Sequence, residues 1–246
     1  MNNKEEIIPL VLVTGMSQAG STLCYNLIRL LIEQSYNNYK VMIQAEQMGS
    51  PPSAIYTHDI GGPKTFVIAK QHDLPISSML HSSQNGVEYK KKRDTGAIPI
   101  IIFNVRRDVR DTTASNLRKN PQQTNVVQIA KTNITYYSDW APVADYEWVY
   151  EDYKKNPIEV TKKMQDVLGD INLNEERLMY VVHKAETIKD LAPETLKNVE
   201  PFTRLKSEHI TNNGKIQAYR DILTDEQIEL LENTFGDWLK EKDYME

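Results

Sequence analysis

The sequence is poor in cysteine, has no long apolar run and shows no excess of basic residues. A single cysteine, Cys24, leaves no disulfide within the chain, and no Cys/His cluster has the spacing of a zinc site. Residues 1–6 are polar and acidic, and the apolar run after them is only as long as a strand. We therefore expect no signal peptide, no membrane-spanning helix and no membrane partner, and a cytoplasmic location.

Composition and charge limit the partners further. The 246 residues carry a formal net charge of −5, which argues against a broad basic surface and hence against a nucleic-acid partner. Apolar residues make up 40% of the chain, enough for an ordinary core. This length suits one domain covering residues 1–246. A phosphate site would need a local cluster of lysine, arginine and backbone N–H groups, and nothing in the sequence indicates an oligomeric state.

The stretch 8–34 is the most informative part of the sequence. A short apolar run at 9–13 predicts a buried strand, the loop GMSQAGST follows at 15–22, and leucines then recur at helical spacing. This context makes a phosphate-binding loop credible. The loop fits G-x-x-x-x-G-K-[ST] except that Ser21 replaces the lysine that reaches the β- and γ-phosphates of a nucleoside triphosphate. It therefore predicts anion binding by N–H groups and a helix N-terminus, without the usual means of holding ATP or GTP.

Strands and helices alternate along the rest of the chain. We expect further strands at 65–69, 98–105 and 148–150, and helices at 111–118, at 156–169 and from Thr224 onward. Residues 36–63 are predicted to be irregular, and 120–145 have no clear pattern. The alternation predicts an α/β fold: a three-layer sandwich around a central, mainly parallel sheet. Ligands of such sheets bind beyond the carboxyl ends of the strands.

Polar side chains follow two of the expected strands. Lys70 and His72 are spaced to face one side of an extended segment, where a lysine could stabilise a leaving phosphate and a histidine could accept a proton. Arg107 leaves another strand, and Ser115 lies one to two helical turns later, so both could bind one phosphate. The residues alone also fit a solvated lysine, a hydrogen-bonded histidine and a ladder of salt bridges after the strand.

Five segments resemble, in order, the motifs of the PAPS-dependent sulfotransferases. VTGMSQAGSTL resembles their 5′-phosphosulfate loop, FVIAKQH the strand with the catalytic base, and RRDVRDTTASNL their 3′-phosphate motif. WVYEDYKKNP resembles their Tyr-Glu-Asp segment, and HITNNGKIQAYRDIL their C-terminal glycine loop. The resemblance covers nearly the whole chain. It implies a P-loop-type fold that transfers a sulfuryl group from PAPS (3′-phosphoadenosine 5′-phosphosulfate) to a small-molecule acceptor, releases PAP and uses no metal.

The resemblance also implies a role for each matching residue. Lys70 would assist the bridging oxygen, and His72 would be the base. Gln18 stands where the family usually has a lysine or arginine that neutralises the leaving group. The donor would be held by the residues of the loop, of the 3′-phosphate motif, of the Tyr-Glu-Asp segment and of the C-terminal loop: Ser17, Gln18, Ala19, Gly20, Ser21, Thr22, Arg107, Ser115, Tyr150, Thr211, Asn213, Gly214 and Lys215.

Two other functions compete with this interpretation. A P-loop small-molecule kinase is disfavoured by Ser21 and by the absence of a magnesium-holding carboxylate at the strand end near Val105. A catalytically idle PAP-binding protein gains some weight from the uncharged Gln18.

The acceptor is expected among three variable segments, 36–62, 75–95 and 120–145. Their side chains are polar and aromatic, with acidic groups among them, which argues against steroid-like acceptors and suits a cationic metabolite. The small size and this lining are similar to small bacterial, cyanobacterial-type sulfotransferases of secondary metabolism, which modify guanidinium alkaloids of the saxitoxin kind. That similarity would imply sulfation of a hydroxyl or of an amine or guanidine.

Overall fold

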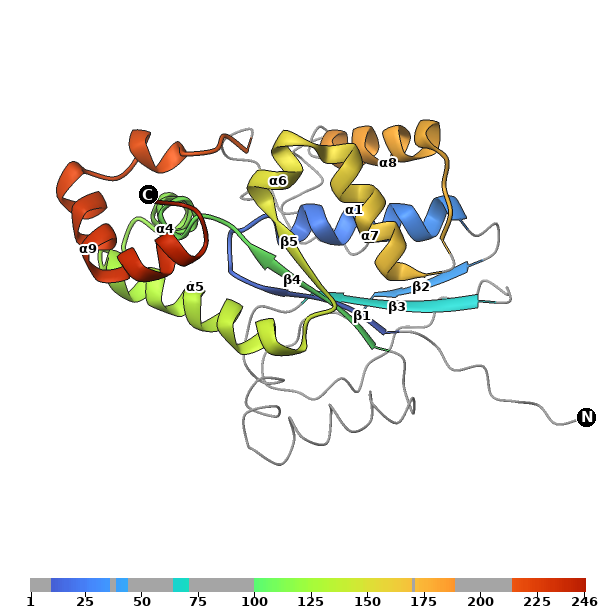
Figure 1. Cartoon of the computed structure of the whole chain (residues 1–246), viewed down its shortest axis with the longest axis horizontal. Helices are drawn as coiled ribbons and strands as arrows, with labels where there is room; N and C mark the ends of the chain where they lie inside the picture. Colours follow the sequence, from blue (N-terminus) through green and yellow to red (C-terminus); the bar gives the residue numbers. More distant parts are fainter. Residues whose placement is uncertain (1–9, 36–38, 44–63, 71–99, 170, 189–213) are drawn as a thin grey trace, which may run out of the picture.

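The computed structural model describes residues 10–35, 39–43, 64–70, 100–169, 171–188 and 214–246 (Figure 1). His72, Thr211 and Asn213 lie outside the described residues. In chain order, the elements are β1 (Leu10–Gly15), α1 (Ser21–Ser35), β2 (Tyr39–Ile43), β3 (Lys64–Lys70), β4 (Ile100–Arg106), α4 (Val109–Lys119), α5 (Val126–Trp140), η1 (Ala141–Val143), β5 (Tyr146–Val149), α6 (Tyr150–Lys155), α7 (Pro157–Leu168), α8 (Glu175–Thr187), η5 (Ala218–Asp221) and α9 (Asp225–Glu241).

The five described strands form one parallel sheet in the order β2-β3-β1-β4-β5. Val11, Leu12 and Val13 of the central strand β1 are buried, which explains why this part of its sequence is a continuous apolar run. Val13 of β1 lies opposite Lys70 of β3, and Gly15 lies opposite Val105 of β4. The carboxyl ends of these three neighbouring strands therefore meet at one edge, as the sequence predicted.

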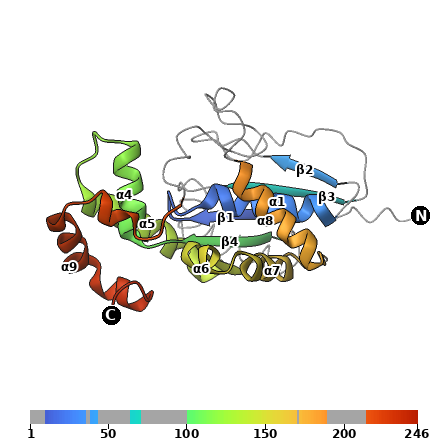
Figure 2. The same cartoon turned by 90° about the horizontal axis from the view of Figure 1, so that it is seen from above.

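Helices cover both faces of the sheet. The helices α1, α6, α7 and α8 lie on one side and α5 on the other, while α4, η5 and α9 lie together beyond the carboxyl ends of the strands (Figures 1 and 2). This arrangement confirms the predicted three-layer α/β fold. Within the described part of the chain, every helix is too short or too polar to span a bilayer.

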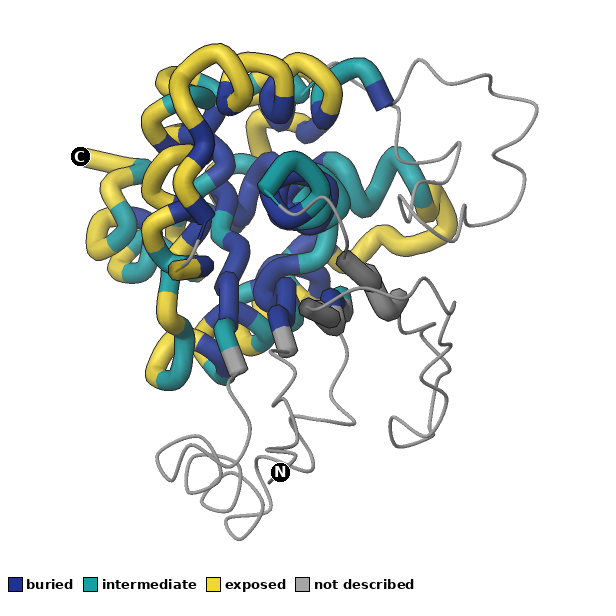
Figure 3. The backbone as a smooth tube through the Cα atoms, turned by 90° about the vertical axis from the view of Figure 1, so that its right-hand side faces the viewer, coloured by how far each residue is buried: buried dark blue, intermediate teal, exposed yellow. Residues whose placement is uncertain are grey.

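The core runs along the sheet and the inner face of α1, where buried backbone gathers in the centre of the molecule (Figure 3). Of the leucines that predicted the helix, Leu27, Leu30 and Leu31 are buried and Leu23 is partly buried. Burial raises the pKa of the Cys24 thiol, so the single cysteine is a neutral core residue.

Two predictions about local structure were wrong. Residues 39–43, expected to be irregular, form the edge strand β2. The predicted strand 148–150 is instead β5 at Tyr146–Val149, and Tyr150 begins α6. The reason is the pairing: Val149 lies opposite Arg106, the last residue of β4, so the ladder has no partner for Tyr150.

The unassigned segment 120–145 contains the helix α5. Its N-cap is Asn125, whose side chain accepts from the backbone N–H of Gln128. The buried face of the helix carries one polar side chain, Asn133, among apolar and aromatic ones: Val126, Ile129, Ala130, Tyr137 and Trp140. A polar residue on a buried face interrupts the apolar spacing by which a helix is recognised in a sequence.

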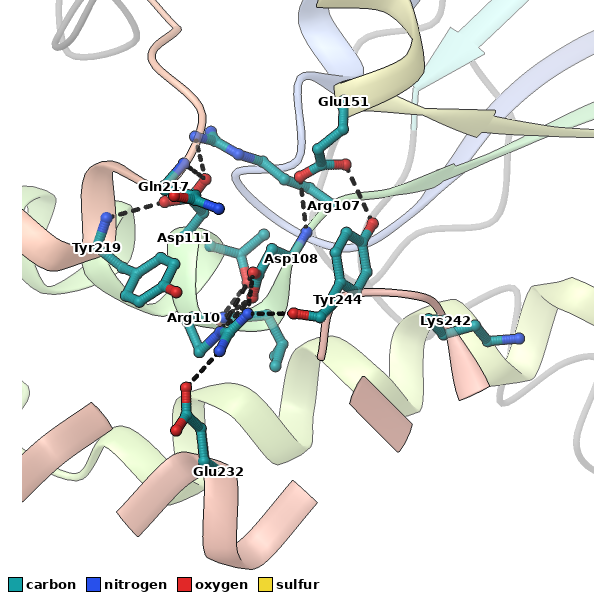
Figure 4. Close-up of polar contacts among 12 residues, drawn as sticks. Arg107, Asp108, Arg110, Asp111, Glu151, Gln217, Tyr219, Glu232, Lys242 and Tyr244 are labelled. Atoms are coloured by element: carbon teal, nitrogen blue, oxygen red, sulfur yellow. Dashed lines mark hydrogen bonds and ion pairs between the residues drawn. The ribbon is translucent and has the colours of Figure 1, made fainter. Parts of the chain in front are cut away.

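Asp111 of α4 fastens the C-terminal segment to the body of the protein. Its fully buried carboxylate accepts hydrogen bonds from the backbone N–H groups of Gln217, at 3.0 Å, and Tyr219, at 2.9 Å (Figure 4). The same carboxylate also pairs with Nη2 of Arg107 at 3.1 Å. One side chain thus connects η5, α4 and the end of β4.

Replacing Asp111 by alanine should strongly destabilise the fold, because it removes the acceptor of two N–H groups and the carboxylate that pairs with a buried guanidinium. We expect the free energy of unfolding to fall by about 3–5 kcal/mol, measured by urea denaturation. Asp111→Asn keeps one acceptor oxygen and should lose less. Asp237→Ala, at an exposed position of α9, is the matched control and should change stability by about 0.5 kcal/mol or less. A loss for Asp111→Ala as small as the control's would contradict this role.

Candidate active site

The loop between β1 and α1 has some of its N–H groups already committed. The N–H of Met16 donates to the carbonyl of Val105 at 3.1 Å, and that of Ser17 donates to Oδ1 of Asn133 at 3.1 Å. Gln18 has a left-handed backbone, with φ of 62°. Residues 18–22 lead from there into the N-terminus of α1, the end of a helix whose N–H groups point toward an anion.

Asn133 of α5 supports this loop and was missed by sequence reasoning. It is buried, and while its Oδ1 accepts from Ser17, its Nδ2 donates to Oγ1 of Thr112 in α4 at 3.0 Å. The residue thereby fixes the loop relative to α4. No motif marked it, because its helix was not recognised.

Lys70 brings a positive charge to the loop from the neighbouring strand. It is the last residue of β3, and its Nζ donates to Oγ1 of Thr22 at 2.7 Å. Ser21, which replaces the usual lysine of the loop, is buried at the first position of α1. The ammonium group near the predicted anion-binding loop thus comes from β3 rather than from the loop itself.

Gln18 and Ser115 lie together, which the sequence did not predict. The Ser115 hydroxyl donates to Oε1 of Gln18 at 3.5 Å, the long limit of a hydrogen bond. The loop after β1 and the helix after β4 therefore meet through these two side chains. The structure thus places residues of the predicted 5′ and 3′ phosphate subsites side by side.

Arg107 is the central residue of the predicted 3′-phosphate subsite. Its side chain is only 10% exposed. Besides Asp111, its Nη2 contacts the carbonyl oxygen of Lys215 at 3.0 Å, and its guanidinium carbon lies 4.4 Å from the ring centroid of Tyr150. Its Nε is buried and has no hydrogen-bond partner among the described residues.

These features fit a phosphate-bearing ligand. A phosphate oxygen would give the Nε of Arg107 an acceptor, as a buried donor requires. Burial and then the positive charge of Arg107 lower the pKa of a second guanidinium, that of Arg118. A bound dianion would offset the repulsion between the two arginines.

Tyr150 lies between the two loops of the site. Its hydroxyl donates to the carbonyl of Gly214 at 2.9 Å, and burial raises its pKa, so the hydroxyl remains a neutral donor. A Cβ at Gly20 would lie 2.7 Å from the ring of Tyr150, and one at Gly214 would lie 2.0 Å from its hydroxyl. Both glycines have positive φ, so their lack of a side chain permits this close packing.

Lys215 contributes to the site through its backbone. Its carbonyl oxygen accepts from Arg107, whereas its exposed ammonium group pairs with Asp221. The structure therefore brings together the described members of the predicted set: residues 17–22, Lys70, Arg107, Ser115, Tyr150, Gly214 and Lys215.

The carboxylates that follow β4 are engaged with protein groups. Asp108 caps α4 by accepting from the backbone N–H of Arg110 and pairs with the guanidinium of the same residue at 2.7 Å. Asp111 is occupied by Arg107 and two N–H groups. In the part of the chain that the structure describes, no group of three or more metal-ligating side chains is gathered.

Comparison with known proteins assigns the family. The model of the sulfotransferase domain matches residues 102–243. A search of curated proteins returned no match. Mouse sulfotransferase SULT7A1 complexed with PAP is similar in structure, with a TM-score of 0.59 and 16% identity over 95% of this chain and 85% of that one.

Two structures of retinol dehydratase are also similar. One is in complex with androsterone and inactive cofactor PAP, with a TM-score of 0.54 and 17% identity over 94% of this chain and 80% of that one. The other contains retinol and PAP, with the same score and identity over 94% and 81% of the two chains. These neighbours share the fold, and the family model covers more than half of the sequence: the chain belongs to the sulfotransferase domain family.

Proposed function

We propose that this sulfotransferase takes its sulfuryl group from PAPS, releases PAP and acts on a small polar acceptor. The observation that carries the proposal is the convergence of the loop at 15–22, Lys70 and Arg107 beyond three neighbouring strands. The three similar structures were all determined with PAP, which supports the same donor here.

The donor would be held at both of its ends. Residues 17–22 would bind the 5′-phosphosulfate, with Ser17 acting through its hydroxyl because its N–H is used by Asn133. Arg107 and Ser115 would bind the 3′-phosphate, and Tyr150 would contact the adenine. Thr211, Asn213, Gly214 and Lys215 would close the site. When bound, PAPS supplies a sulfuryl group activated by its anhydride to phosphate.

The chain's own side chains would position the reaction and stabilise charge, without metal. The ammonium of Lys70, held by Thr22, would stabilise the negative charge that develops on the leaving phosphate oxygen. Gln18 would donate a hydrogen bond there without adding charge. His72 would accept the proton of the acceptor group.

The acceptor that we propose is polar or cationic, such as a guanidinium alkaloid of the saxitoxin kind. Support comes from the polar, aromatic and acidic composition of 36–62 and 75–95, which lie largely outside the described residues. From 120–145, Tyr137 and Trp140 are buried in the contacts of α5, so they are less suited to line an acceptor site. Labelled PAPS and mass spectrometry with guanidinium compounds, phenols and steroids would test the proposal and distinguish O- from N-sulfation.

Two other functions would give different results in binding and turnover assays. A P-loop kinase should bind Mg-ATP more tightly than PAP, although Ser21 and the engaged carboxylates of Asp108 and Asp111 disfavour it. An idle PAP-binding protein should bind PAP without turnover over the full acceptor panel.

Removing the guanidinium of Arg107 should weaken PAP binding. We expect Arg107→Ala to raise the Kd of PAP about 10- to 100-fold, the usual effect of losing hydrogen bonds to a charged group, measured by calorimetry. Arg107→Lys should fall between, because lysine keeps the charge but loses the planar fork. The control is Arg177→Ala, at an exposed position of α8. Unchanged PAP affinity in Arg107→Ala would refute the 3′-phosphate assignment.

Removing the proposed base should affect turnover and spare donor binding. His72→Ala should lower kcat by roughly 10²–10⁴-fold while the Kd of PAP stays within error. His183→Ala, which changes an exposed histidine of α8, should keep full activity. Near-normal turnover of His72→Ala with the cognate acceptor would show that another group is the base.

Adding charge at position 18 should speed the reaction if charge at the leaving group limits the rate. Gln18→Lys is expected to raise kcat by about 10-fold, even though the left-handed backbone at this position constrains every side chain. Gln18→Met, of similar length but without polar groups, should lower kcat. A fall in kcat for Gln18→Lys would instead show that the amide has its own role, including its contact with Ser115.

A further inference from the structure

The carboxylate of Glu151 joins the turn after β4 to the C-terminal end of the chain. Its Oε1 accepts from the backbone N–H of Asp108 at 3.0 Å, and its Oε2 accepts from the hydroxyl of Tyr244 at 3.1 Å (Figure 4). Glu151 is 7% exposed and follows Tyr150 in α6. A single buried side chain thus connects Asp108, the residue after Arg107, to the third residue from the end.

Tyr244 contacts two arginines that flank Arg107 in the sequence, Arg106 and Arg110. Its carbonyl oxygen accepts from Nη2 of Arg110 at 2.8 Å, and the guanidinium carbon of Arg106 lies 5.2 Å from its ring centroid. The ring also stacks on Trp238 of α9, with centroids 5.9 Å apart and planes at 25°. Tyr244 therefore contacts the chain on both sides of Arg107.

These contacts fix the backbone from which Arg107 projects. Asp108 is restrained twice: Glu151 holds its N–H, and its own carboxylate caps α4 and pairs with Arg110. A small rotation of this turn would move the guanidinium of Arg107 relative to Ser115 and Tyr150. Misplacement of a binding group by about 1 Å is enough to change ligand interactions strongly.

We propose that Tyr244, acting through Glu151, is a positioning residue for Arg107 and thereby sets the affinity for the 3′-phosphate of the donor. The inference rests on the proposed function, because it assumes that Arg107 binds that phosphate. Burial raises the pKa of both Tyr244 and Glu151, so the tyrosine hydroxyl remains a neutral donor in this contact.

The test is Tyr244→Phe, which removes the hydroxyl and keeps the ring and the main-chain contacts. Calorimetry should show the Kd of PAP raised roughly 2- to 12-fold, the factor expected for one buried hydrogen bond. Binding of adenosine 5′-monophosphate, which lacks the 3′-phosphate, should not change. In steady-state assays the KM for PAPS should rise while kcat stays near that of the parent. The matched control is Tyr180→Phe, at an exposed position of α8.

A double-mutant cycle separates positioning from a purely structural role. If Tyr244 acts through Arg107, then Tyr244→Phe should have no further effect on PAP binding in an Arg107→Ala background. Glu151→Gln keeps an acceptor oxygen for the N–H of Asp108 and should bind PAP more tightly than Glu151→Ala. Additive effects in the cycle, or lower thermal stability of Tyr244→Phe with unchanged PAP affinity, would overturn the inference.

The outcomes also separate this inference from the proposed function. If the unaltered chain does not bind PAP, both are wrong. If it does bind PAP and Arg107→Ala weakens the binding, while Tyr244→Phe binds as tightly as the parent, only the positioning role is wrong.

Discussion

The buried guanidinium of Arg107 joins segments that are far apart in the sequence. It leaves the end of β4, pairs with Asp111 of α4, lies over the ring of Tyr150 in α6 and binds the carbonyl of Lys215 near η5. Arginine stays protonated at all accessible pH values, so its burial requires compensating partners. The same partners that make the charge tolerable would also assemble the proposed phosphate subsite. Fold and site therefore share one electrostatic requirement.

The buried charges of Asp108 and Arg110 also need compensating partners, and some of these come from α9 and the residues after it. Arg110 pairs with Asp108 and Glu232 and binds the carbonyl of Tyr244, so its charge attaches both α9 and the residues after it. Such buried pairs contribute little net stability, because desolvation offsets the attraction between the charges. Their effect is geometric: they specify one arrangement of the C-terminal elements.

The pKa values of the buried carboxyls agree with this view. Burial raises the pKa of Asp108 and of Glu151 in spite of their hydrogen bonds. A carboxyl whose pKa is higher in the folded than in the unfolded chain favours the fold most when it is protonated. Its contribution falls as the pH rises through the two pKa values. At neutral pH these two groups therefore cost stability and are retained at positions that fix the turn carrying Arg107.

Local signals explain which parts the sequence could predict. The loop after β1 and the arginine after β4 follow strongly apolar strands, and α9 begins with the capping box of Thr224 and Gln227. Each of these signals is contained within a few consecutive residues. The ends of β5 could not be read in this way, because pairing with β4 determines them.

Long-range contacts explain what was missed. Asn133 matters because it meets Ser17, 116 residues earlier, and Tyr244 because it meets Glu151, 93 residues earlier. Neither residue has a neighbouring motif, and an asparagine or a tyrosine near a helix is unremarkable in composition. Only the fold shows that each of them restrains a segment of the candidate site.

The position of Lys70 links the positive charge beside the loop to the register of the sheet. The backbone of the loop would itself position a lysine at residue 21, whereas Lys70 reaches Thr22 from the strand β3. Its place beside the loop follows from the pairing of Val13 with Lys70 between β1 and β3. A shift of that pairing by one residue would turn the lysine to the other face of the sheet. The charge that a P-loop kinase carries in its loop is therefore supplied here by strand pairing, with Ser21 buried at the start of α1.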